Sequence, residues 1–485
     1  MRYSKKLIFL LASLIIAAIL VYNFSARTSV SRIKSQGADQ ESATSQKRYN
    51  ILFILIETLR ADHLGCYGYK RNISPNMDKI AREGIFFTNF ISVSPWTTPA
   101  VVSLFSGKYP QAVFPPFKKD WKKDYRFPDE VDTLAEILRI NGYHTIALSD
   151  HGLVTKELNY AQGFNVFEFL PPIRKSLKQA RRNEVEFMTE KVAEQISECQ
   201  GEKFFLYLHV MYPHYPYKPP LKYRRKFGYV SGKEPRKIST RKLIRTYDGE
   251  IKLTDDLIGS IYDRLDKMRL LENTYLIITS DHGEGFREHG LIMHGTSLYR
   301  ELLHVPLIIH FPKTMAQNYR TVDNLTSFID LYPTIMEFAG VSNFPTVDGK
   351  SLSRFIEKKE DRKFYSTIFS ESPHALCSEG LSCQNDQFKL IFMPTDKSSI
   401  EEARNSIGVK NVSFKRFQLY DLKNDIREQK NILHGNEIVA FILGLKLLWH
   451  KIWNEMRRSR IKHHGEMSKE LKKIVKDRFR SLGYL

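Results

Sequence analysis

Residues 50–63 have the sequence N-I-L-F-I-L-I-E-T-L-R-A-D-H, and this stretch sets the expected fold. Its first seven residues are nearly all apolar, which is typical of a strand buried on both faces. Similar short runs recur along the chain and alternate with helical patterns. The other expected strands are Thr145–Leu148, Phe204–His209, Tyr275–Thr279 and Val305–His310, and the clearest helices are Val131–Ile140 and Ile251–Leu265. This order predicts an α/β fold with a mostly parallel mixed sheet and helices on both faces.

Polar side chains that can bind a metal follow three of these strands. Glu57 follows the first strand, His209 ends the third with His214 shortly after it, and Asp281 and His282 follow the fourth. Because the carboxyl ends of parallel strands meet at one edge of a sheet, where sites gather, we expect these side chains to lie there.

The carboxylates at this edge need partners, because an unpaired buried charge is costly. Glu57 can pair with Arg60 or bind a metal, and Asp281 with His282 offers an oxygen and an imidazole nitrogen from one turn. His294 adds another imidazole a dozen residues later. This mixed set suits zinc or manganese better than calcium. We expect one divalent ion, with Mn or Zn favoured over Mg or Ca.

A candidate nucleophile lies in residues 94–107, S-P-W-T-T-P-A-V-V-S-L-F-S-G. Pro99 suits the first position of a helix, which predicts Thr98 as the N-cap through its hydroxyl. Thr97 then lies just outside the helix, whose N-terminus favours a developing alkoxide. A hydroxyl becomes a strong nucleophile when a bound metal lowers its pKa. Thr97 is therefore the candidate nucleophile and a further metal ligand.

The chain is strongly basic, with 74 Lys+Arg against 54 Asp+Glu and a formal net charge of +20 over 485 residues. This excess suits anionic lipids or phosphorylated or sulphated substrates, such as glycans, lipids or polymers. It also suits nucleic acid, but no nucleic-acid reading motif occurs, so we expect no such partner. The four cysteines do not form a metal framework, although Cys377 and Cys383 can pair in an oxidising compartment.

The N-terminus predicts a membrane anchor. Residues 7–22, LIFLLASLIIAAILVY, follow Arg2, Lys5 and Lys6. A cleaved signal peptide is the alternative, but the run is long for one and no convincing cleavage site follows it. We expect residues 1–25 to anchor the chain and residues 26–48 to form a flexible stalk. The remainder would then be periplasmic, extracellular or luminal.

The rest of the chain divides into three expected parts. Residues 49–345 form the catalytic domain and residues 346–432 a small antiparallel subdomain, with strands near Phe364–Phe369, Gln387–Met393 and Phe417–Leu422. Residues 433–485 form a basic helical tail. Its apolar helix can lie on an anionic membrane or pack on the main domain with a solvated outer face, and we favour the packed helix.

From about residue 49 onward the chain resembles the sulfatase family, within the alkaline-phosphatase superfamily. The opening metal-ligand segment of that family is similar to I-E-T-L-R-A-D-H-L-G-C-Y-G-Y, and its nucleophile segment to T-T-P-A-V-V-S-L-F-S-G-K-Y-P. The second metal segment is similar to T-S-D-H-G-E-G-F-R-E-H-G. Further ordered matches include L-H-V-M-Y-P-H-Y-P-Y and D-L-Y-P-T-I-M-E-F-A-G-V.

The sequence departs from this pattern at its chemical centre. Sulfatases that use formylglycine carry Cys or Ser followed by x-Pro-x-Arg, whereas Thr97 and Val101 stand at the modified and arginine positions. Threonine cannot become formylglycine. Asp150, in S-D-H-G, stands where the family's Gly-Lys-x-His segment has lysine. The resemblance therefore implies that two cationic sulphate contacts are missing.

These departures resemble a threonine-dependent branch, the lipoteichoic acid synthases and phosphoethanolamine transferases. Their Glu, Thr, Asp and His set falls on Glu57, Thr97, Asp281 and His282, with His214 and His294 as further catalytic candidates. The resemblance implies a metal-dependent hydrolase or transferase of phosphoesters. The alternatives are a sulphate-ester hydrolase without formylglycine and a non-catalytic surface protein that binds an anionic polymer.

Overall fold

The computed structural model describes residues 48–114, 126–170, 183–228, 235–315, 320–356, 364–372, 380–393 and 416–461, with residues 473 and 477. The predicted anchor, nearly all of the predicted stalk, Cys377 and most of the tail after residue 461 lie outside these ranges. In the part of the chain that the structure describes, no helix is long and apolar enough to span a bilayer.

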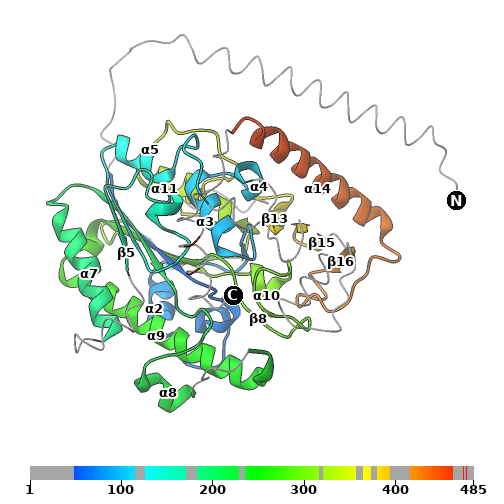
Figure 1. Cartoon of the computed structure of the whole chain (residues 1–485), viewed down its shortest axis with the longest axis horizontal. Coiled ribbons are helices and arrows are strands. Elements are labelled where there is room, and N and C mark those ends of the chain that lie inside the picture. Colours follow the sequence, from blue (N-terminus) through cyan, green and yellow to red (C-terminus); the bar gives the residue numbers. More distant parts are fainter. Residues whose placement is uncertain are drawn as a thin grey trace, which may run out of the picture. The chain divides into compact units, whose positions relative to one another are not determined.

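An eight-stranded mixed sheet forms the centre of the molecule (Figure 1). Its spatial order is β11 (Arg320–Val322), β2 (Ile85–Phe87), β10 (Leu307–His310), β7 (Thr274–Ser280), β1 (Asn50–Ile56), β6 (Phe204–Val210), β4 (His144–Ser149) and β5 (Val166–Phe169). The five strands from β7 to β5 run parallel to one another. Strand β10 is antiparallel to both of its neighbours, β7 and β2. The predicted mostly parallel mixed sheet is confirmed.

Strand β1 lies between two hydrophobic cores and contributes side chains to both. Ile51, Phe53 and Leu55 belong to one core, shared with α3 (Thr97–Ser106), α5 (Leu134–Ile140) and α11 (Leu331–Phe338). The alternate residues of β1 belong to the other core, which α2 (Pro75–Glu83), α7 (Glu184–Glu198) and α9 (Thr240–Lys267) complete (Figure 1). Because successive side chains of a strand point to opposite faces, a continuous apolar strand is the sequence that serves both cores.

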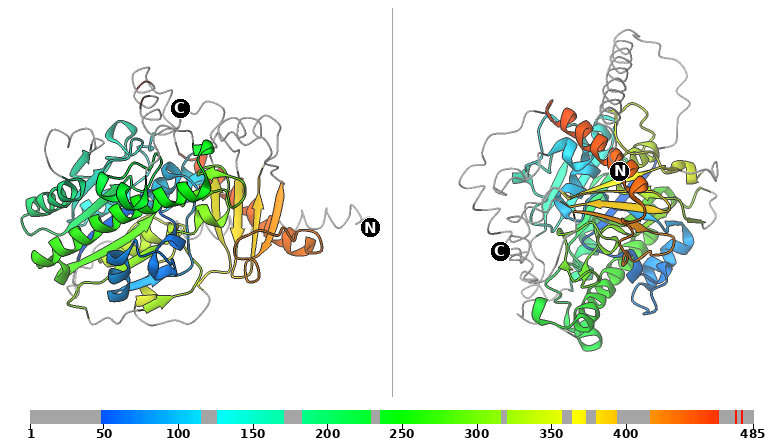
Figure 2. Two further views of the ribbon diagram at one scale, coloured as in Figure 1. Left: turned by 90° about the horizontal axis from the view of Figure 1, so that it is seen from below. Right: turned by 90° about the vertical axis from the view of Figure 1, so that its right-hand side faces the viewer.

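A second, smaller sheet is antiparallel throughout, as expected for the C-terminal region (Figure 2). Its strands are β13 (Ile368–Ser372), β14 (Gly380–Gln384), β15 (Phe388–Phe392) and β16 (Phe417–Asp421). Helix α14 (Glu437–Arg458) packs on it through Leu443 and Leu447. Cys383 of β14 is buried, with its thiol 3.5 Å from the backbone oxygen of Leu443. Because Cys377 lies outside the described residues, its pairing with Cys383 stays a prediction.

Several element boundaries differ from the sequence-based expectation. The strand expected at Val305–His310 begins only at Leu307, after Pro306, which has no N–H for a sheet ladder. Helix α5 begins at Leu134, because Thr133 and Glu136 form a capping box. The strand expected at Phe364–Phe369 begins at Ile368, and β14 was not expected. The shorter elements are α4 (Pro110–Val113), α8 (Leu221–Phe227), α10 (Arg300–Leu303), α12 (Ser353–Ile356), β3 (Phe90–Ile91), β8 (Gly285–Phe286), β9 (Ile292–Met293), β12 (Thr326–Ser327) and the 3-10 turns η1 (Ala61–His63), η2 (Gly65–Tyr67), η3 (Lys156–Leu158), η4 (Pro235–Lys237), η5 (Leu270–Asn273) and η6 (Phe328–Asp330).

Candidate active site

The predicted polar residues gather at the carboxyl edge of the parallel strands. Glu57 follows β1, His209 pairs with Leu55 at the end of β6, and Asp281 with His282 follows β7. Glu57, His209, Asp281 and His282 are all completely buried. The shared register of β1, β6 and β7 brings together residues that are far apart in sequence.

Helix α3 delivers Thr97 to this cluster. The helix begins at Thr97, after Trp96 in an extended conformation. Thr97 Oγ1 donates a hydrogen bond to Glu57 Oε1 at 2.5 Å and lies 3.2 Å from His282 Nε2. Thr97 is thus the first residue of the helix rather than a residue outside it.

The predicted cap at Thr98 is wrong. Thr98 lies inside the first turn of α3, and no side-chain hydrogen bond caps the helix. Its Oγ1 is buried without a hydrogen-bond partner among the described residues. Pro99 remains compatible with the helix, because the first four N–H groups have no intrahelical acceptor.

Asp281 and His282 are held by the backbone of the turn after β7. Asp281 Oδ1 accepts hydrogen bonds from Thr58 N at 3.1 Å and from His282 N at 2.9 Å. Asp281 Oδ2 is buried and accepts no hydrogen bond in the described structure, and it lies 3.2 Å from His282 Nε2. Nδ1 of His282 is 2.9 Å from the carbonyl oxygen of Gly283, which favours a proton on Nδ1 and directs Nε2 toward Glu57.

The cluster fits a divalent cation. Glu57, His209 and Asp281 each present a ligand atom, and these atoms lie within 4.8 Å of one another. The buried Asp281 Oδ2 with no hydrogen-bond donor is the kind of atom that a cation would satisfy. Thr97 Oγ1 lies beside Glu57, and His282 Nε2 lies beside both Glu57 and Asp281.

His209 was expected at this edge but was not assigned a catalytic or ligand role, and His151 was not predicted at all. His209 Nε2 lies 3.0 Å from Glu57 Oε2, and its Nδ1 lies 2.9 Å from the Tyr207 hydroxyl. His151 stacks on His209 with ring centroids 5.0 Å apart, and its Nε2 is 4.0 Å from Glu57 Oε2. The position of His209 at a strand end was the available signal. His151 lies in the S-D-H-G segment, where only the missing lysine drew attention.

His214 and His294 form the side of the cluster nearest to solvent, with 5% and 6% of their surface exposed. The His294 ring is 4.5 Å from that of His282 and 5.1 Å from that of His214, centroid to centroid. His294 Nδ1 lies 3.0 Å from Glu284 Oε1, and Tyr217 donates to Glu284 Oε2 at 2.8 Å. Glu284, in D-H-G-E-G, is a further buried residue that sequence reasoning passed over.

Burial and pairing set the charges of these groups. Although burial acts to raise it, the pKa of Glu57 lies well below its ordinary value because His151, His209 and His282 favour the carboxylate. Burial acts to lower the pKa of His282, but Asp281 and Glu57 hold it well above the ordinary value, so His282 must release this proton before its Nε2 can bind a cation. Burial lowers the pKa of His214 to about 4 and that of His294 to about 3, so both are neutral at pH 7.

Neither of the two positions where the family pattern has a sulphate-binding arginine or lysine carries a cationic side chain in this chain. Val101 is completely buried in a hydrophobic core on α3. The Asp150 carboxylate accepts a hydrogen bond from Met211 N at 2.8 Å, and burial raises its pKa to about 7. Arg60, the alternative partner of Glu57, forms ion pairs with Asp62 at 2.8 Å and with Glu288 at 2.5 Å instead.

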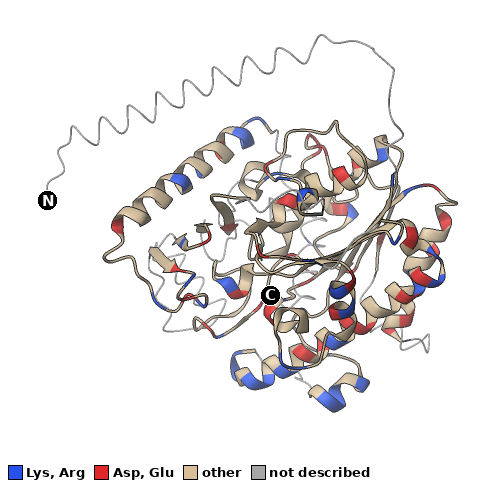
Figure 3. Ribbon diagram, turned by 180° about the vertical axis from the view of Figure 1, so that it is seen from behind, with Lys and Arg blue, Asp and Glu red and all other residues tan. Residues whose placement is uncertain are grey.

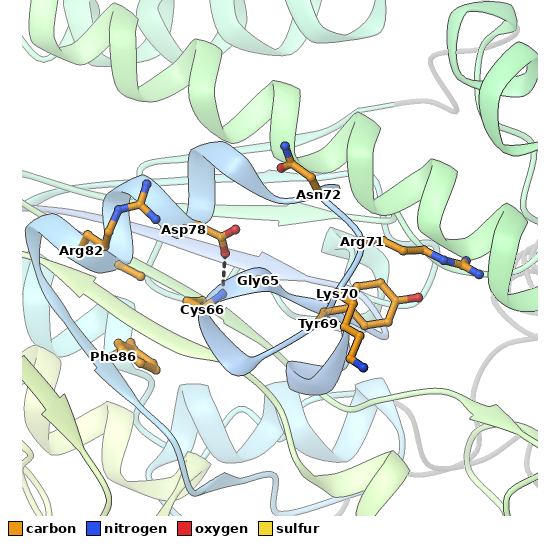
Figure 4. Close-up of a pocket in the computed structure, with 10 residues that line it drawn as sticks. Gly65, Cys66, Tyr69, Lys70, Arg71, Asn72, Asp78, Arg82 and Phe86 are labelled. Carbon is orange, nitrogen blue, oxygen red and sulfur yellow. Dashed lines mark hydrogen bonds between the residues drawn. The ribbon is translucent and has the colours of Figure 1, made fainter.

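A surface pocket of about 380 Å³ lies beside η2 and α2 (Figure 4). Lys70, Arg71 and Arg82 are among its lining residues, and its Asp78 carboxylate accepts a hydrogen bond from Cys66 N at 2.8 Å. None of the predicted site residues lines it. The buried cluster around Thr97 is therefore the candidate active site.

Comparison with known protein families gives two matches. A model described as Sulfatase matches residues 49–341. A model described as N-sulphoglucosamine sulphohydrolase, C-terminal, matches residues 287–404. The first covers the strands and turns that carry every residue of the buried cluster.

Relatives with curated descriptions are also sulfatases. The uncharacterized sulfatase YidJ of Escherichia coli (strain K12) is 26% identical over 360 residues, which cover 63% of this chain and 71% of the relative. An ulvan-active sulfatase of Formosa agariphila is 25% identical and covers 74% of each chain. A delta 4,5-hexuronate-2-O-sulfatase of Bacteroides thetaiotaomicron is 22% identical, covering 81% of this chain and 86% of the relative.

Solved structures share the fold at low identity. The phosphonate monoester hydrolase of Agrobacterium radiobacter has a TM-score of 0.68 at 19% identity, covering 84% of this chain and 96% of that one. A structure in complex with its substrate D-glucosamine-2-N,6-O-disulfate has a TM-score of 0.66 at 19% identity, covering 85% and 98%. These likenesses concern the fold alone.

Proposed function

The chain belongs to the sulfatase family, and from this premise we propose that it is a metal-dependent esterase or transferase that cleaves phosphoesters through Thr97. One observation carries the proposal. Thr97 Oγ1 lies at the N-terminus of α3, 2.5 Å from Glu57 Oε1 and 3.2 Å from His282 Nε2. A hydroxyl that cannot become an aldehyde thus occupies the centre of the acidic and imidazole cluster.

Glu57, Thr97, Asp281 and His282 would hold the cation, as the threonine branch implies. When bound, a divalent cation lowers the pKa of the Thr97 hydroxyl and neutralises charge on an anionic substrate. The rest of the chemistry belongs to the chain's own residues. Glu57 orients the hydroxyl through its hydrogen bond, and Asp281 is fixed by Thr58 N and His282 N.

The first half-reaction would transfer the phosphoryl group to threonine. Thr97 enters as the alkoxide, its proton released to solvent, and its Oγ1 attacks phosphorus in line. The Thr97 Oγ1–P bond forms while the bond from phosphorus to the leaving oxygen breaks. An aryl leaving group departs as phenolate, whereas an alkoxide takes a proton from solvent.

The second half-reaction would release the group from threonine to water or to an acceptor hydroxyl. His294 is neutral, and with a proton on Nδ1 toward Glu284 Oε1 its lone pair would lie on Nε2. We assign it as the base that takes the proton of the attacking water or hydroxyl, since a bound phosphoryl anion would stabilise the imidazolium. His214, on the same side, would contact the phosphoryl oxygens.

Sulphate-ester hydrolysis is the second candidate, and the relatives favour it. Those described above are named as sulfatases rather than as lipoteichoic acid synthases or phosphoethanolamine transferases, and two act on an ulvan or a hexuronate by name. A sulphated glycan is therefore the natural alternative substrate. This candidate requires a threonine alkoxide to cleave the ester without the aldehyde and with Val101 in the arginine position.

The deciding experiment compares aryl phosphodiesters, aryl phosphates and aryl sulphates with the same leaving group. We expect hydrolysis of a phosphoester by the wild-type chain, its loss in Thr97→Ala, and a mass increase of the phosphoryl fragment on Thr97 when the reaction is quenched. Hydrolysis of the aryl sulphate alone would establish the sulfatase alternative. Purified protein that binds no Mn²⁺ or Zn²⁺ and cleaves none of these esters would favour the non-catalytic, polymer-binding alternative.

A further inference from the structure

Helix α14 has an apolar outer face. Five of the nine exposed large apolar side chains in the described part of the chain lie on this helix. Ile438, Phe441 and Leu448 are 76%, 57% and 53% exposed, and Ile442 and Trp449 are exposed with them. Their spacing of three, four and seven residues places them on one side of the helix. The helix thus packs on the protein with a solvent-exposed outer face, as expected, but the exposed side chains are hydrophobic.

The opposite face of α14 is fixed to the protein, which sets the rotation of the helix. Leu443 and Leu447 are buried against the small sheet. The buried Glu371 carboxylate lies 2.6 Å from His450 Nε2 and accepts a hydrogen bond from Asn454 Nδ2 at 2.7 Å. Two buried polar contacts are broken if the helix rolls, so the apolar face cannot turn inward without a large cost.

Basic residues outnumber acidic residues on α14. The helix carries Lys446, Lys451, Arg457 and Arg458 against Glu437 and Glu455, a balance of 4 − 2 = +2. Lys446, Arg457 and Arg458 bond to Thr367, Asp348 and Gln111 beside the packed side of the helix. From residue 446 to the C-terminus the sequence contains 12 Lys+Arg and 4 Asp+Glu, a balance of 12 − 4 = +8. Figure 3 shows α14 as a mostly uncharged helix that is acidic at its beginning and basic in its middle and at its end.

We propose that the outer face of α14 binds the surface of an anionic lipid bilayer. A long helix with one apolar face and basic neighbours is the combination that lies in the headgroup region, with its apolar side chains inserted and its cations toward anionic lipids. Trp449 on this face, with the adjacent Trp453 ring stacked at 6.4 Å, matches the preference of tryptophan for the bilayer interface.

The chain outside the described structure favours a bilayer over a second copy. Residues 7–22 form the predicted anchor, and residues 26–48 would span at most about 80 Å if fully extended. A domain tethered at that distance meets the membrane surface at high effective concentration, so weak interfacial insertion suffices. The proposal is independent of the reaction assigned to Thr97.

The test uses the full chain in vesicles of phosphatidylcholine with 30% phosphatidylglycerol, with brominated lipids as quenchers of tryptophan fluorescence. The variant Phe441→Glu/Leu448→Glu places charge on the outer face. Ile140→Glu is the control, because Ile140 is also exposed but lies on α5. Trp449→Phe/Trp453→Phe measures the quenching that comes from the other tryptophans. Thermal unfolding of each variant verifies the fold.

We expect strong quenching in the wild type and in Ile140→Glu, and at least a twofold loss of quenching in the outer-face variant and in Trp449→Phe/Trp453→Phe. Equal quenching in the wild type and the outer-face variant would overturn the proposal. So would a wild-type face that crosslinks to a second copy while its tryptophans stay unquenched. If vesicles without phosphatidylglycerol quench equally well, the basic residues have no part and the anionic specificity is wrong.

Discussion

Thr97 Oγ1 donates a hydrogen bond of 2.5 Å to Glu57 Oε1 across a separation of 40 residues. The contact joins the end of the central strand to the first residue of a buried helix. Glu57 is in turn bound at its other oxygen by His209 at 3.0 Å. The proposed nucleophile, the proposed acidic ligand and a neighbouring imidazole are therefore connected in one chain of contacts, and each link can be broken separately.

The neighbouring threonines provide a matched pair for testing the nucleophile. Thr97→Val keeps the shape of the side chain but removes the hydroxyl, and we expect kcat to fall at least 1000-fold, about 4 kcal/mol of transition-state stabilisation. Thr98→Val should change kcat less than about threefold, because Thr98 Oγ1 has no hydrogen-bond partner among the described residues. Steady-state hydrolysis of an aryl phosphodiester measures both. Equal losses in the two variants would indicate a packing effect instead.

His209 should affect cation binding by positioning Glu57, although its Nε2 also lies among the candidate ligand atoms. Its Nε2 contacts Glu57 Oε2, and the Tyr207 hydroxyl fixes its Nδ1. We expect His209→Ala to weaken Mn²⁺ or Zn²⁺ binding by about 10- to 100-fold, as for other residues that orient a ligand. His209→Gln retains a donor near Glu57 and should recover part of the affinity in a chelator-competition titration.

The control for this titration is His310→Gln. His310 is also buried, but its Nε2 lies 3.2 Å from the Tyr262 hydroxyl at the opposite end of the sheet. Its substitution should leave the metal affinity unchanged. Metal binding by His209→Ala that equals the wild-type value would exclude a positioning role.

The charge of the preferred substrate follows from the missing cations. Val101 and Asp150 occupy the positions expected for arginine and lysine, and the carboxylates of Glu57 and Asp281 offset a divalent cation. A site of such low positive charge suits a monoanion better than a dianion. We expect kcat/KM at pH 8 to be at least tenfold higher for an aryl phosphodiester than for the matched phosphate monoester. A preference for the monoester would show that other cations reach the substrate.

Sequence reasoning predicted the sheet and the gathering of Glu57, Asp281 and His282 at its edge because each rested on a local signal. The apolar run of β1 specifies a buried strand, and a carboxylate at its end specifies the edge. Thr98 was assigned as a cap because Pro99 suits the first helical turn at several positions, so the proline alone does not fix where the helix begins. His151 depends on the pairing of β4 with β6, which no local pattern contains. The sequence of α14 does not show which of its apolar residues face solvent, because this depends on the contact between His450 and the distant residue Glu371.

A buried carboxyl far from the cluster should make stability depend on pH. Asp255 on α9 accepts hydrogen bonds from Asn76 N at 3.0 Å and Met77 N at 2.9 Å at the start of α2. Burial raises its pKa to about 6 from the ordinary value of 3.8. A raised pKa means that the folded state binds the proton more tightly, so this contribution is fully present below pH 3.8 and is lost as the pH rises through about 6.

Asp255→Asn removes the titration and retains an oxygen that can accept both N–H groups. Its free energy of unfolding, relative to wild type, should therefore increase between pH 4 and pH 8 by up to about 3 kcal/mol, measured by urea denaturation. Asp256→Asn is the control. Although burial acts to raise its pKa, hydrogen bonds from Lys252, Tyr223 and Lys222 lower the pKa of Asp256. Its carboxylate therefore stabilises the fold above pH 4, and Asp256→Asn should lose stability toward neutral pH. If the free energy of unfolding changed with pH in the same way in both variants, the prediction would be wrong, because burial raises the pKa of Asp255 whereas hydrogen bonds lower that of Asp256.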